Sequence, residues 1–389
     1  MRKLTGNANR FFVRLICVFL CAAVALTFPF VAECEEGSAE TPRAMLLMEA
    51  RTGQVLYSVN AAEKLPMASI TKVMSLLVLS DFIDDGRLTL EEKVKASAYA
   101  SSAEGSVIWL SPGEEMTAAE LLEAVIVSSA NDACIALAEH VAGSEEQFVR
   151  LMNRRAKKMG LSGTKFTGCV GFDAKGHYTT AEDIAVMTAE LMEKEYYRGW
   201  LLTWLDYLRG GDTQLLNTNK LVRYYDGILG GKTGTTDGAG CCLTACAERG
   251  GMRLVAVVLG CGEDPERFDR AEELLDMGFS GYEKFTPEVD SRKLLPITVE
   301  RGEYSTVQPV VQDYGECVIK RGRAGSVDYS YTFVDGVKAP VEKGQFLGEY
   351  LVTLDGVEVF RSDIVAKEEV RRMNFGMYLL CVLGEMVSF

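Results

Sequence analysis

Three short groups of residues in this chain carry side chains suited to nucleophilic chemistry. The first is Ser69-Ile-Thr-Lys72, in which a serine and a lysine stand three positions apart. In a helix these positions share one face, so the hydroxyl and the amine can share a proton. The amine is a base only when neutral, and burial or a second nearby cation lowers a lysine pKa toward that state. A serine in the first helical turn also lies near N–H groups that favour a developing anion.

The same spacing recurs at Ser162-Gly-Thr-Lys165, so the spacing is weak evidence on its own. Gly160 and Gly163 bracket the start of this second match and predict a turn there rather than a helical face. We therefore take only Ser69 and Lys72 as the candidate nucleophile and base.

The second group is Ser129-Ala-Asn131, which falls in a break between two predicted helices. A hydroxyl and an amide in such a break can face a cleft, where Ser129 could relay a proton to a leaving group. Asn131 could hold a substrate amide and orient Lys72. The alternative is helix capping, which serine and asparagine favour, and Ser58-Val-Asn60 has the same spacing inside a predicted strand.

The third group is Lys232-Thr-Gly234, preceded by Gly230-Gly231 and followed by Thr235. A phosphate-binding loop is the first alternative, but it requires a glycine where Asp226 stands and a helix where this sequence predicts a strand. A lysine on a strand, beside a glycine that lets another backbone approach, suits a carboxylate instead. The N–H groups of the strand can also bind an extended peptide by added-strand pairing.

The region that contains these three groups has predicted strands at both of its ends and predicted helices in its middle. The sequence Thr117-Ala-Ala-Glu120 is a capping box that starts one of the helices. The pattern predicts an α+β domain with an antiparallel sheet over residues 41–283. Its expected strands cover 45–49, 54–59, 241–247 and 253–259, and its expected helices cover 69–83, 121–127, a segment ending at 141, and 266–277.

The residue pattern of the sequence changes near residue 284. Short alternating segments separated by glycine and proline predict a small all-β domain over 284–370, with Asp355-Gly356 as a hairpin turn and no evident catalytic cluster. The tail, 371–389, starts with Arg371-Arg372 and then carries only one charge, Glu385. It suits a helix lying on a membrane surface, and the alternative is a core helix that closes the β domain.

Residues 1–39 predict a secretory signal peptide. A positively charged start precedes the uncharged run 15–32, and small or acidic residues follow. The alternative is an uncleaved anchor, because these 18 residues are almost long enough to span a bilayer. In either case we expect the protein to be extracytoplasmic, secreted and associated with the outer face of the cytoplasmic membrane.

Composition excludes several classes of function. The 389 residues carry a net charge of -14 with no local basic stripe, which argues against nucleic acid as a partner. Only two histidines are present, His140 and His177, so we expect no multi-histidine metal site and no cofactor. Most of the eleven cysteines are expected to be small buried hydrophobic residues, because Cys242 and Cys246 would stand about 13 Å apart along a strand.

Together the three groups occur in the order SxxK, SxN, KTG, with 60 residues from Ser69 to Ser129 and 101 from Asn131 to Lys232. This is the active-serine set of penicillin-binding proteins. The chain resembles the low-molecular-mass D-alanyl-D-alanine carboxypeptidases, peptidase family S11. The resemblance implies a β-lactamase/transpeptidase-like domain followed by a small all-β domain, and it rests on the segments 44–75, 128–144, 176–183 and 230–260.

The resemblance implies that Ser69 attacks the peptide bond between two terminal D-alanines of a peptidoglycan stem peptide, with Lys72 as its base. Ser129 would pass the proton to the departing D-alanine. Water would then hydrolyse the acyl-enzyme, and β-lactams would acylate Ser69 as mimics of the dipeptide.

The resemblance also implies how the substrate is bound. Lys232 and Thr233 would hold the terminal carboxylate, beside Asn131 and Gly234. The N–H groups of Ser69 and Thr235 would form the oxyanion hole.

This sequence departs from the family pattern at three places. Ala130 replaces the usual glycine of the middle motif, Thr218 stands where some members have an arginine, and Cys241 replaces a frequent tyrosine. Two other functions share the motifs. A class A-like β-lactamase would need a positioned glutamate and lacks the β domain and tail, whereas a penicillin-sensing or wall-binding protein would keep the fold and release no D-alanine.

Overall fold

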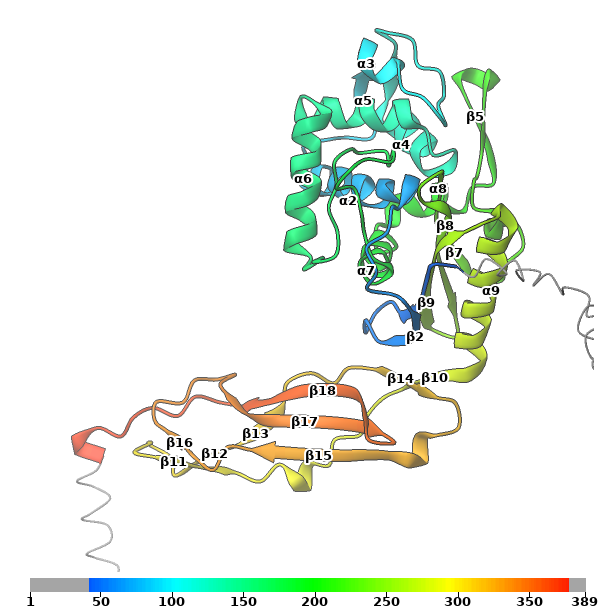
Figure 1. Cartoon of the computed structure of the whole chain (residues 1–389). Helices are drawn as coiled ribbons and strands as arrows, with labels where there is room; N and C mark the ends of the chain where they lie inside the picture. Colours follow the sequence, from blue (N-terminus) through cyan, green and yellow to red (C-terminus); the bar gives the residue numbers. More distant parts are fainter. Residues whose placement is uncertain (1–41, 378–389) are drawn as a thin grey trace, which may run out of the picture. The chain divides into compact units, whose positions relative to one another are not determined.

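The computed structural model describes residues 42–377, and its first domain is built on a five-stranded antiparallel sheet (Figure 1). The predicted hairpin at its N-terminal end is confirmed, because β1 and β2 pair with each other. The strand order brings the two ends of the domain together, since β1 also pairs with β9. The order is β2 (Val55–Val59), β1 (Ala44–Glu49), β9 (Met252–Cys261), β8 (Gly240–Arg249), β7 (Ile228–Thr236).

Both faces of this sheet are buried, which explains the almost unbroken apolar run of β9. Alternate residues of a strand point to opposite faces. Leu254, Ala256 and Val258 pack with helix α9 (Asp264–Gly281), whereas Val255 and Val257 join the core formed with the other helices. A continuous hydrophobic strand is typical of a sheet covered on both sides.

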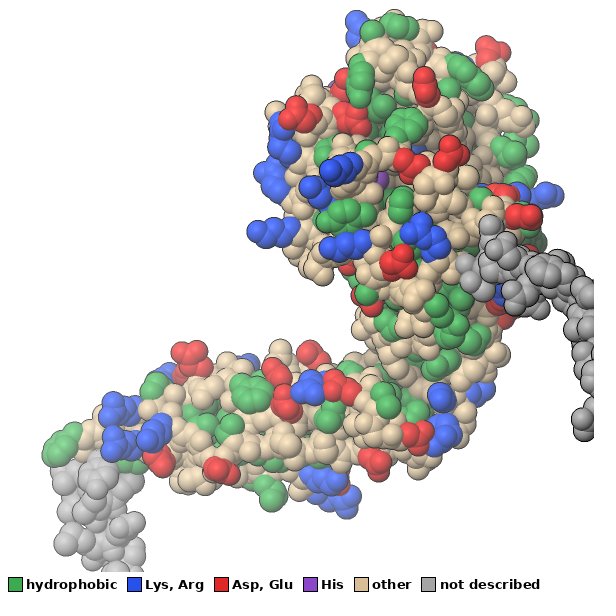
Figure 2. All heavy atoms as spheres, in the orientation of Figure 1, with side chains coloured by type: hydrophobic (Ala, Val, Ile, Leu, Met, Phe, Trp, Pro, Cys, Tyr) green, Lys and Arg blue, Asp and Glu red, His purple; other side chains and the backbone are tan. Residues whose placement is uncertain are grey.

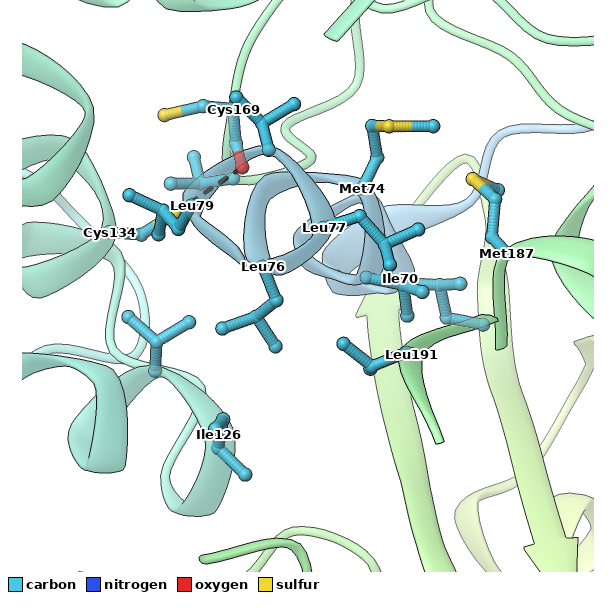
Figure 3. Close-up of a cluster of buried hydrophobic side chains, with 14 of the residues drawn as sticks. Ile70, Met74, Leu76, Leu77, Leu79, Ile126, Cys134, Cys169, Met187 and Leu191 are labelled. Carbon is cyan, nitrogen blue, oxygen red and sulfur yellow. Dashed lines mark hydrogen bonds between the residues drawn. The ribbon is translucent and has the colours of Figure 1, made fainter. Parts of the chain in front are cut away.

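Helix α2 (Thr71–Asp84) lies inside the helical part of the domain, directly after a 3₁₀ turn, η1 (Ala68–Ile70). Its apolar residues point in every direction, and Figure 3 shows them among side chains of α4 and α7. A helix that is hydrophobic all round is a buried one. The surrounding elements are α3 (Ala98–Ser101), α4 (Ala118–Val127), α5 (Asn131–Ala142), α6 (Glu145–Lys158), α7 (Ala181–Leu191), α8 (Arg198–Leu202), β3 (Lys93–Lys95), β4 (Glu115–Thr117), β5 (Leu205–Leu208) and β6 (Thr213–Leu216).

The second domain is all-β and starts directly after α9. Its largest sheet has the order β13-β18-β17-β15, and buried residues such as Tyr350, Val352 and Leu354 alternate with partly buried ones along β17. Its strands are β10 (Tyr282–Phe285), β11 (Ile297–Glu300), β12 (Thr306–Val307), β13 (Pro309–Val311), β14 (Cys317–Lys320), β15 (Val327–Phe333), β16 (Val337–Lys338), β17 (Phe346–Leu354) and β18 (Val357–Ala366).

Most of these elements agree with the prediction from sequence, whereas some of their first and last residues differ from it. The α+β class, the capping box at Thr117, the helix break before Asn131 and the turn at Asp355-Gly356 are confirmed. The last helix of the first domain starts at Asp264 and runs to Gly281, so it is longer than the predicted 266–277. Proline in its first turn lacks an N–H that the helix would not use there, which favours this earlier start.

The predicted boundary between residues 283 and 284 falls inside β10. This strand pairs with β14 of the second domain along its whole length. The predicted signal segment, 1–39, and most of the predicted tail, 378–389, lie outside the described residues. Within 42–377, no helix has the length and apolar character needed to cross a bilayer.

Candidate active site

Ser69 and Lys72 meet as the helical spacing predicts. Ser69 lies in η1 and Lys72 in the first turn of α2, and the Lys72 Nζ donates a hydrogen bond of 2.9 Å to the Ser69 Oγ. The Lys72 side chain is fully buried, and this burial lowers the pKa of Lys72 to about 8. About half of the amine is therefore neutral near pH 8, next to the hydroxyl.

A loop over residues 169–171 fixes the direction of the amine. The Lys72 Nζ also donates to the carbonyl oxygen of Val170 at 3.0 Å. The preceding carbonyl, that of Cys169, accepts from the Ser75 Oγ at 2.6 Å and from the Cys134 Sγ at 3.5 Å, as the dashed line in Figure 3 shows for the cysteine pair. Two neighbouring helices thus hold the loop that orients Lys72.

The backbone before Ser69 is held by a glycine and by a histidine. A Cβ on Gly171 would lie 1.9 Å from the carbonyl oxygen of Ala68, so only glycine lets the loop approach this closely. The Thr71 Oγ1 donates to that same oxygen at 2.8 Å and lies 2.7 Å from the His177 Nε2. Burial lowers the pKa of His177 to about 4, so the ring is neutral and serves as a structural link.

Ser129 lies in the turn between α4 and α5, and Asn131 is the first residue of α5. Ser129 has a φ of 62°, a strained conformation for a residue with a side chain. Among the described residues, neither the Ser129 Oγ nor the Asn131 Oδ1 has a hydrogen-bond partner, although both atoms are buried. Since buried polar atoms are nearly always paired, these two are available for a substrate. The Asn131 Nδ2 donates to the carbonyl oxygen of Glu104 at 2.6 Å.

The KTG residues lie on β7, which is the last strand of the sheet and runs beside η1. A Cβ on Gly234 would lie 2.8 Å from the backbone nitrogen of Ser69, so glycine permits this contact between the strand and Ser69. Lys232 is buried, and its pKa is lowered well below the usual range by burial, then by the charges of Lys72 and Arg267. A bound carboxylate would favour the charged form of this amine.

Thr218 connects the second and third groups. Its Oγ1 accepts a hydrogen bond of 2.6 Å from the Thr233 Oγ1, and its N–H donates to the carbonyl oxygen of Val127 at the end of α4. The structure therefore links the helix break before Asn131 to the KTG strand. Close contacts also join Ser69 to Lys72 and to Gly234, so the first and third groups meet directly, and Thr218 ties the third group to the end of α4 beside the second.

Sequence reasoning missed Arg267, a buried arginine on α9. Its Nη1 donates to the carbonyl oxygen of Gly234 at 3.1 Å and to the Thr235 Oγ1 at 3.0 Å. Its position in the sequence could have indicated this burial. Arg267 lies on the same helical stripe as Ala271, Leu274 and Gly278, and this stripe faces the sheet. A charged residue within an apolar stripe indicates a specific partner.

Sequence reasoning also missed Asp132, which is buried directly after Asn131. Its carboxylate accepts hydrogen bonds from the N–H groups of Ile108 and Leu110 at 3.0–3.1 Å. This carboxylate fixes the loop over residues 104–110 against the start of α5. No local pattern marks the pairing, because 22 to 24 residues separate its partners.

Comparisons with known proteins agree with this geometry. A family described as D-alanyl-D-alanine carboxypeptidase, peptidase S11, matches residues 32–263, and one described as penicillin-binding protein 5, C-terminal domain, matches residues 282–372. The chain is 36% identical to D-alanyl-D-alanine carboxypeptidase DacF of Bacillus subtilis, over 97% of this chain and 99% of the relative. It is 35% identical to DacC of Escherichia coli, over 92% of each.

Solved structures give the same result. Penicillin-binding protein 5 from Haemophilus influenzae has a TM-score of 0.79 and 27% identity, over 85% of this chain and 98% of that one. Penicillin-binding protein D2 from Listeria monocytogenes, solved with ampicillin bound, has a TM-score of 0.54 and 29% identity, over 61% of this chain and 97% of that one. The resemblance inferred from the motifs is confirmed, and the chain belongs to the D-alanyl-D-alanine carboxypeptidase family of serine hydrolases.

Proposed function

We propose that this protein removes the terminal D-alanine from peptidoglycan stem peptides through an acyl-enzyme on Ser69. One observation carries the proposal. The Lys72 Nζ lies 2.9 Å from the Ser69 Oγ, and its burial lowers the pKa of Lys72 to about 8. A serine is a weak nucleophile until an adjacent base takes its proton, and this pair supplies both groups.

In the first step, the Ser69 Oγ forms a bond to the carbonyl carbon of the penultimate D-alanine while Lys72 takes the hydroxyl proton. The N–H groups of Ser69 and Thr235 stabilise the oxyanion. The C–N bond then breaks, and Ser129, whose hydroxyl has no partner among the described residues, passes the proton to the leaving amine. Water hydrolyses the ester and regenerates the Ser69 hydroxyl.

In this proposal, the substrate binds to the edge strand β7 and to the start of α5. Lys232 and Thr233 hold the terminal carboxylate, and Arg267 adds positive charge behind them. The Asn131 amide oxygen, which has no partner within residues 42–377, accepts from a substrate N–H. Gly234 keeps the strand close to Ser69, so an extended peptide along β7 meets the nucleophile.

β-Lactams acylate Ser69 by the same attack, with the lactam carbonyl in place of the peptide carbonyl. The similarity to the ampicillin-bound and cefotaxime-bound structures of Listeria penicillin-binding protein D2 supports this part of the proposal.

We propose that the protein works outside the cytoplasm, with residues 1–39 as its signal and 371–389 as a tail that associates with a membrane. The proposed domains, 41–283 and 284–370, divide inside β10, which pairs with β14 of the second domain. A hollow at the end of the β domain supports the tail's role, because Arg301 and Arg372 line it together with Tyr304 and Phe375. Figure 2 shows Lys and Arg side chains gathered at this end. Basic and aromatic side chains together suit a membrane surface.

The test is D-alanine release from a diacyl-D-alanyl-D-alanine peptide by the protein lacking residues 1–39. The proposal predicts release by the unchanged sequence and none by Ser69→Ala. A protein that is acylated by penicillin but releases no D-alanine would be a sensor, and one that hydrolyses penicillin rapidly would be a β-lactamase.

A further inference from the structure

Trp109 is exposed and strained, in a loop that reaches the active site. Its side chain is 78% exposed although Ile108 and Leu110 on either side are buried. Its φ is 55°, in the left-handed region that a bulky residue seldom adopts. Strain of this kind persists only where the surroundings enforce it, and it concentrates at functional sites.

Two charged residues enforce the conformation. The Asp132 carboxylate accepts from the N–H groups immediately before and after Trp109, at 3.1 Å and 3.0 Å. The Arg209 Nη1 donates to the carbonyl oxygen of Ile108 at 2.8 Å, and its Nε bonds the Glu114 carboxylate at 2.7 Å. The loop is therefore rigid, and it presents the indole to solvent as a fixed surface.

The same loop is attached to the substrate-binding turn. The N–H of Asn131 donates to the carbonyl oxygen of Ser106 at 2.7 Å, and the Asn131 side chain donates to that of Glu104 at 2.6 Å. Asp132, which holds Trp109, is the next residue along α5. The loop that carries the indole is thus attached to the part of the site proposed to bind the substrate amide.

A second exposed apolar surface lies on the hairpin of β5 and β6. Leu205 pairs with Leu216, so these side chains share a face with Tyr207, and all three are exposed. The opposite face packs on the domain through Leu215, which is fully buried.

This hairpin joins the same site at both of its ends. Thr218, two residues after β6 ends, bonds the Thr233 hydroxyl of the KTG strand. At the other end, Arg209 contacts the loop of Trp109. The hairpin therefore connects the strand of the proposed carboxylate site with the loop that carries the indole.

We infer that Trp109 and the exposed face of the β5–β6 hairpin bind the peptidoglycan strand beyond its D-alanyl-D-alanine end, and so favour polymeric substrate over short peptides. The inference rests on the proposed function, because that function places the dipeptide at Ser69. The rest of the polymer must then extend away from Ser69 over the neighbouring surface. Polymeric peptidoglycan offers sugar rings and extended peptide, and both present C–H groups that pack on an aromatic face.

The test compares two substrates in the protein lacking residues 1–39. We would measure kcat/KM for D-alanine release from a diacyl-D-alanyl-D-alanine peptide and from polymeric peptidoglycan that carries pentapeptide stems. Trp109→Gly suits the left-handed backbone and removes only the indole. We expect it to lower the ratio of polymer to peptide activity about tenfold, through KM, and Tyr207→Ala to lower it about threefold. Trp109→Phe should keep most of the preference, and Tyr314→Ala, an exposed tyrosine of the β domain, should keep all of it.

An equal loss on both substrates would overturn the inference, since Trp109 would then act on the catalytic centre through Asp132. No change on either substrate would also overturn it. If the unchanged protein sedimented as a dimer and Trp109→Gly as a monomer, the surface would instead bind a second copy of the chain.

Co-sedimentation with insoluble peptidoglycan separates this inference from the proposed function. If the unchanged protein released no D-alanine from either substrate, the proposed function would fail. Weaker co-sedimentation of Trp109→Gly than of Tyr314→Ala would still support the binding surface, and equal co-sedimentation would overturn it.

Discussion

The two domains differ in what they bury. Among residues 42–377, every buried polar or charged side chain but one belongs to the α+β domain, and the exception is Ser362 in β18. The β domain closes its core with apolar and aromatic side chains such as Tyr350 and Val352. Burying charge is costly unless partners or a function compensate. The comparison teaches that the α+β domain buries the cations Lys72, Lys232 and Arg267, which the proposed function uses, whereas the β domain buries no charged side chain among the described residues.

The largest effect should follow removal of the amine of Lys72, the proposed base. Lys72→Met keeps the length of the side chain and deletes the amine, so we expect the rate of acylation by a fluorescent penicillin to fall on the order of 10³-fold. The thermal unfolding midpoint should be unchanged or raised, because an apolar group suits the buried position better than an amine does. Lys338→Met, at an exposed lysine of the β domain, is the control and should change neither quantity. Equal losses in both variants would contradict the comparison.

The acylation rate should also depend on pH through Lys72. Because only the neutral amine accepts the serine proton, the rate should rise with pH and level off above a midpoint near 8, the lowered pKa of Lys72. The free energy of unfolding should also rise with pH. The unfolded chain, with its ordinary lysine pKa near 10.5, binds a proton that the folded protein has lost between pH 8 and 10.5, so the folded state gains stability as pH rises through this window. A flat rate from pH 6 to 9 would rule out Lys72 as the base.

Arg267 should have a smaller effect, on binding more than on chemistry. Arg267→Met deletes the hydrogen bonds to Gly234 and Thr235, each a charge-assisted bond, so we expect kcat/KM for D-alanine release to fall about tenfold to a hundredfold, mainly through KM. Arg270→Met on the same helix, where the arginine pairs with Glu273 at the surface, is the matched control. If kcat alone fell and KM did not change, Arg267 would have a different role.

The smallest effect on catalysis should come from the β domain. Tyr350→Ala removes a buried ring and its hydrogen bond to the carbonyl oxygen of Glu288, which should destabilise that domain by about 3 to 5 kcal/mol. We expect the acylation rate of the folded protein to stay within about twofold of its original value, since none of the proposed catalytic residues lies in this domain. Denaturant unfolding monitored alongside penicillin labelling would measure both. A large loss of labelling in the folded protein would show that the domains are coupled.

Much of the site could be predicted from the sequence because its signals are local. The spacing of Ser69 and Lys72, the capping box at Thr117 and the break before Asn131 each depend on neighbours within four residues. The order of the three motifs then indicated the fold family.

The residues that were missed act over long distances in the sequence. Arg267 reaches a strand 32 to 33 residues before it, and Asp132 binds N–H groups 22 to 24 residues before it. Such partners depend on how strands and helices assemble, including the pairing of β1 with β9. Hydrophobic patterns predict which face of an element is buried, and they do not specify which element covers it.

The central claim is that Ser69 is the nucleophile and the neutral amine of Lys72 its base. Mass spectrometry of the protein after treatment with penicillin, followed by mapping of the modified peptide, tests it most directly. The account predicts one penicilloyl adduct, on Ser69, that forms faster at pH 9 than at pH 7 and is nearly absent in Lys72→Met. An adduct on any other residue, or rapid labelling of Lys72→Met, would contradict it.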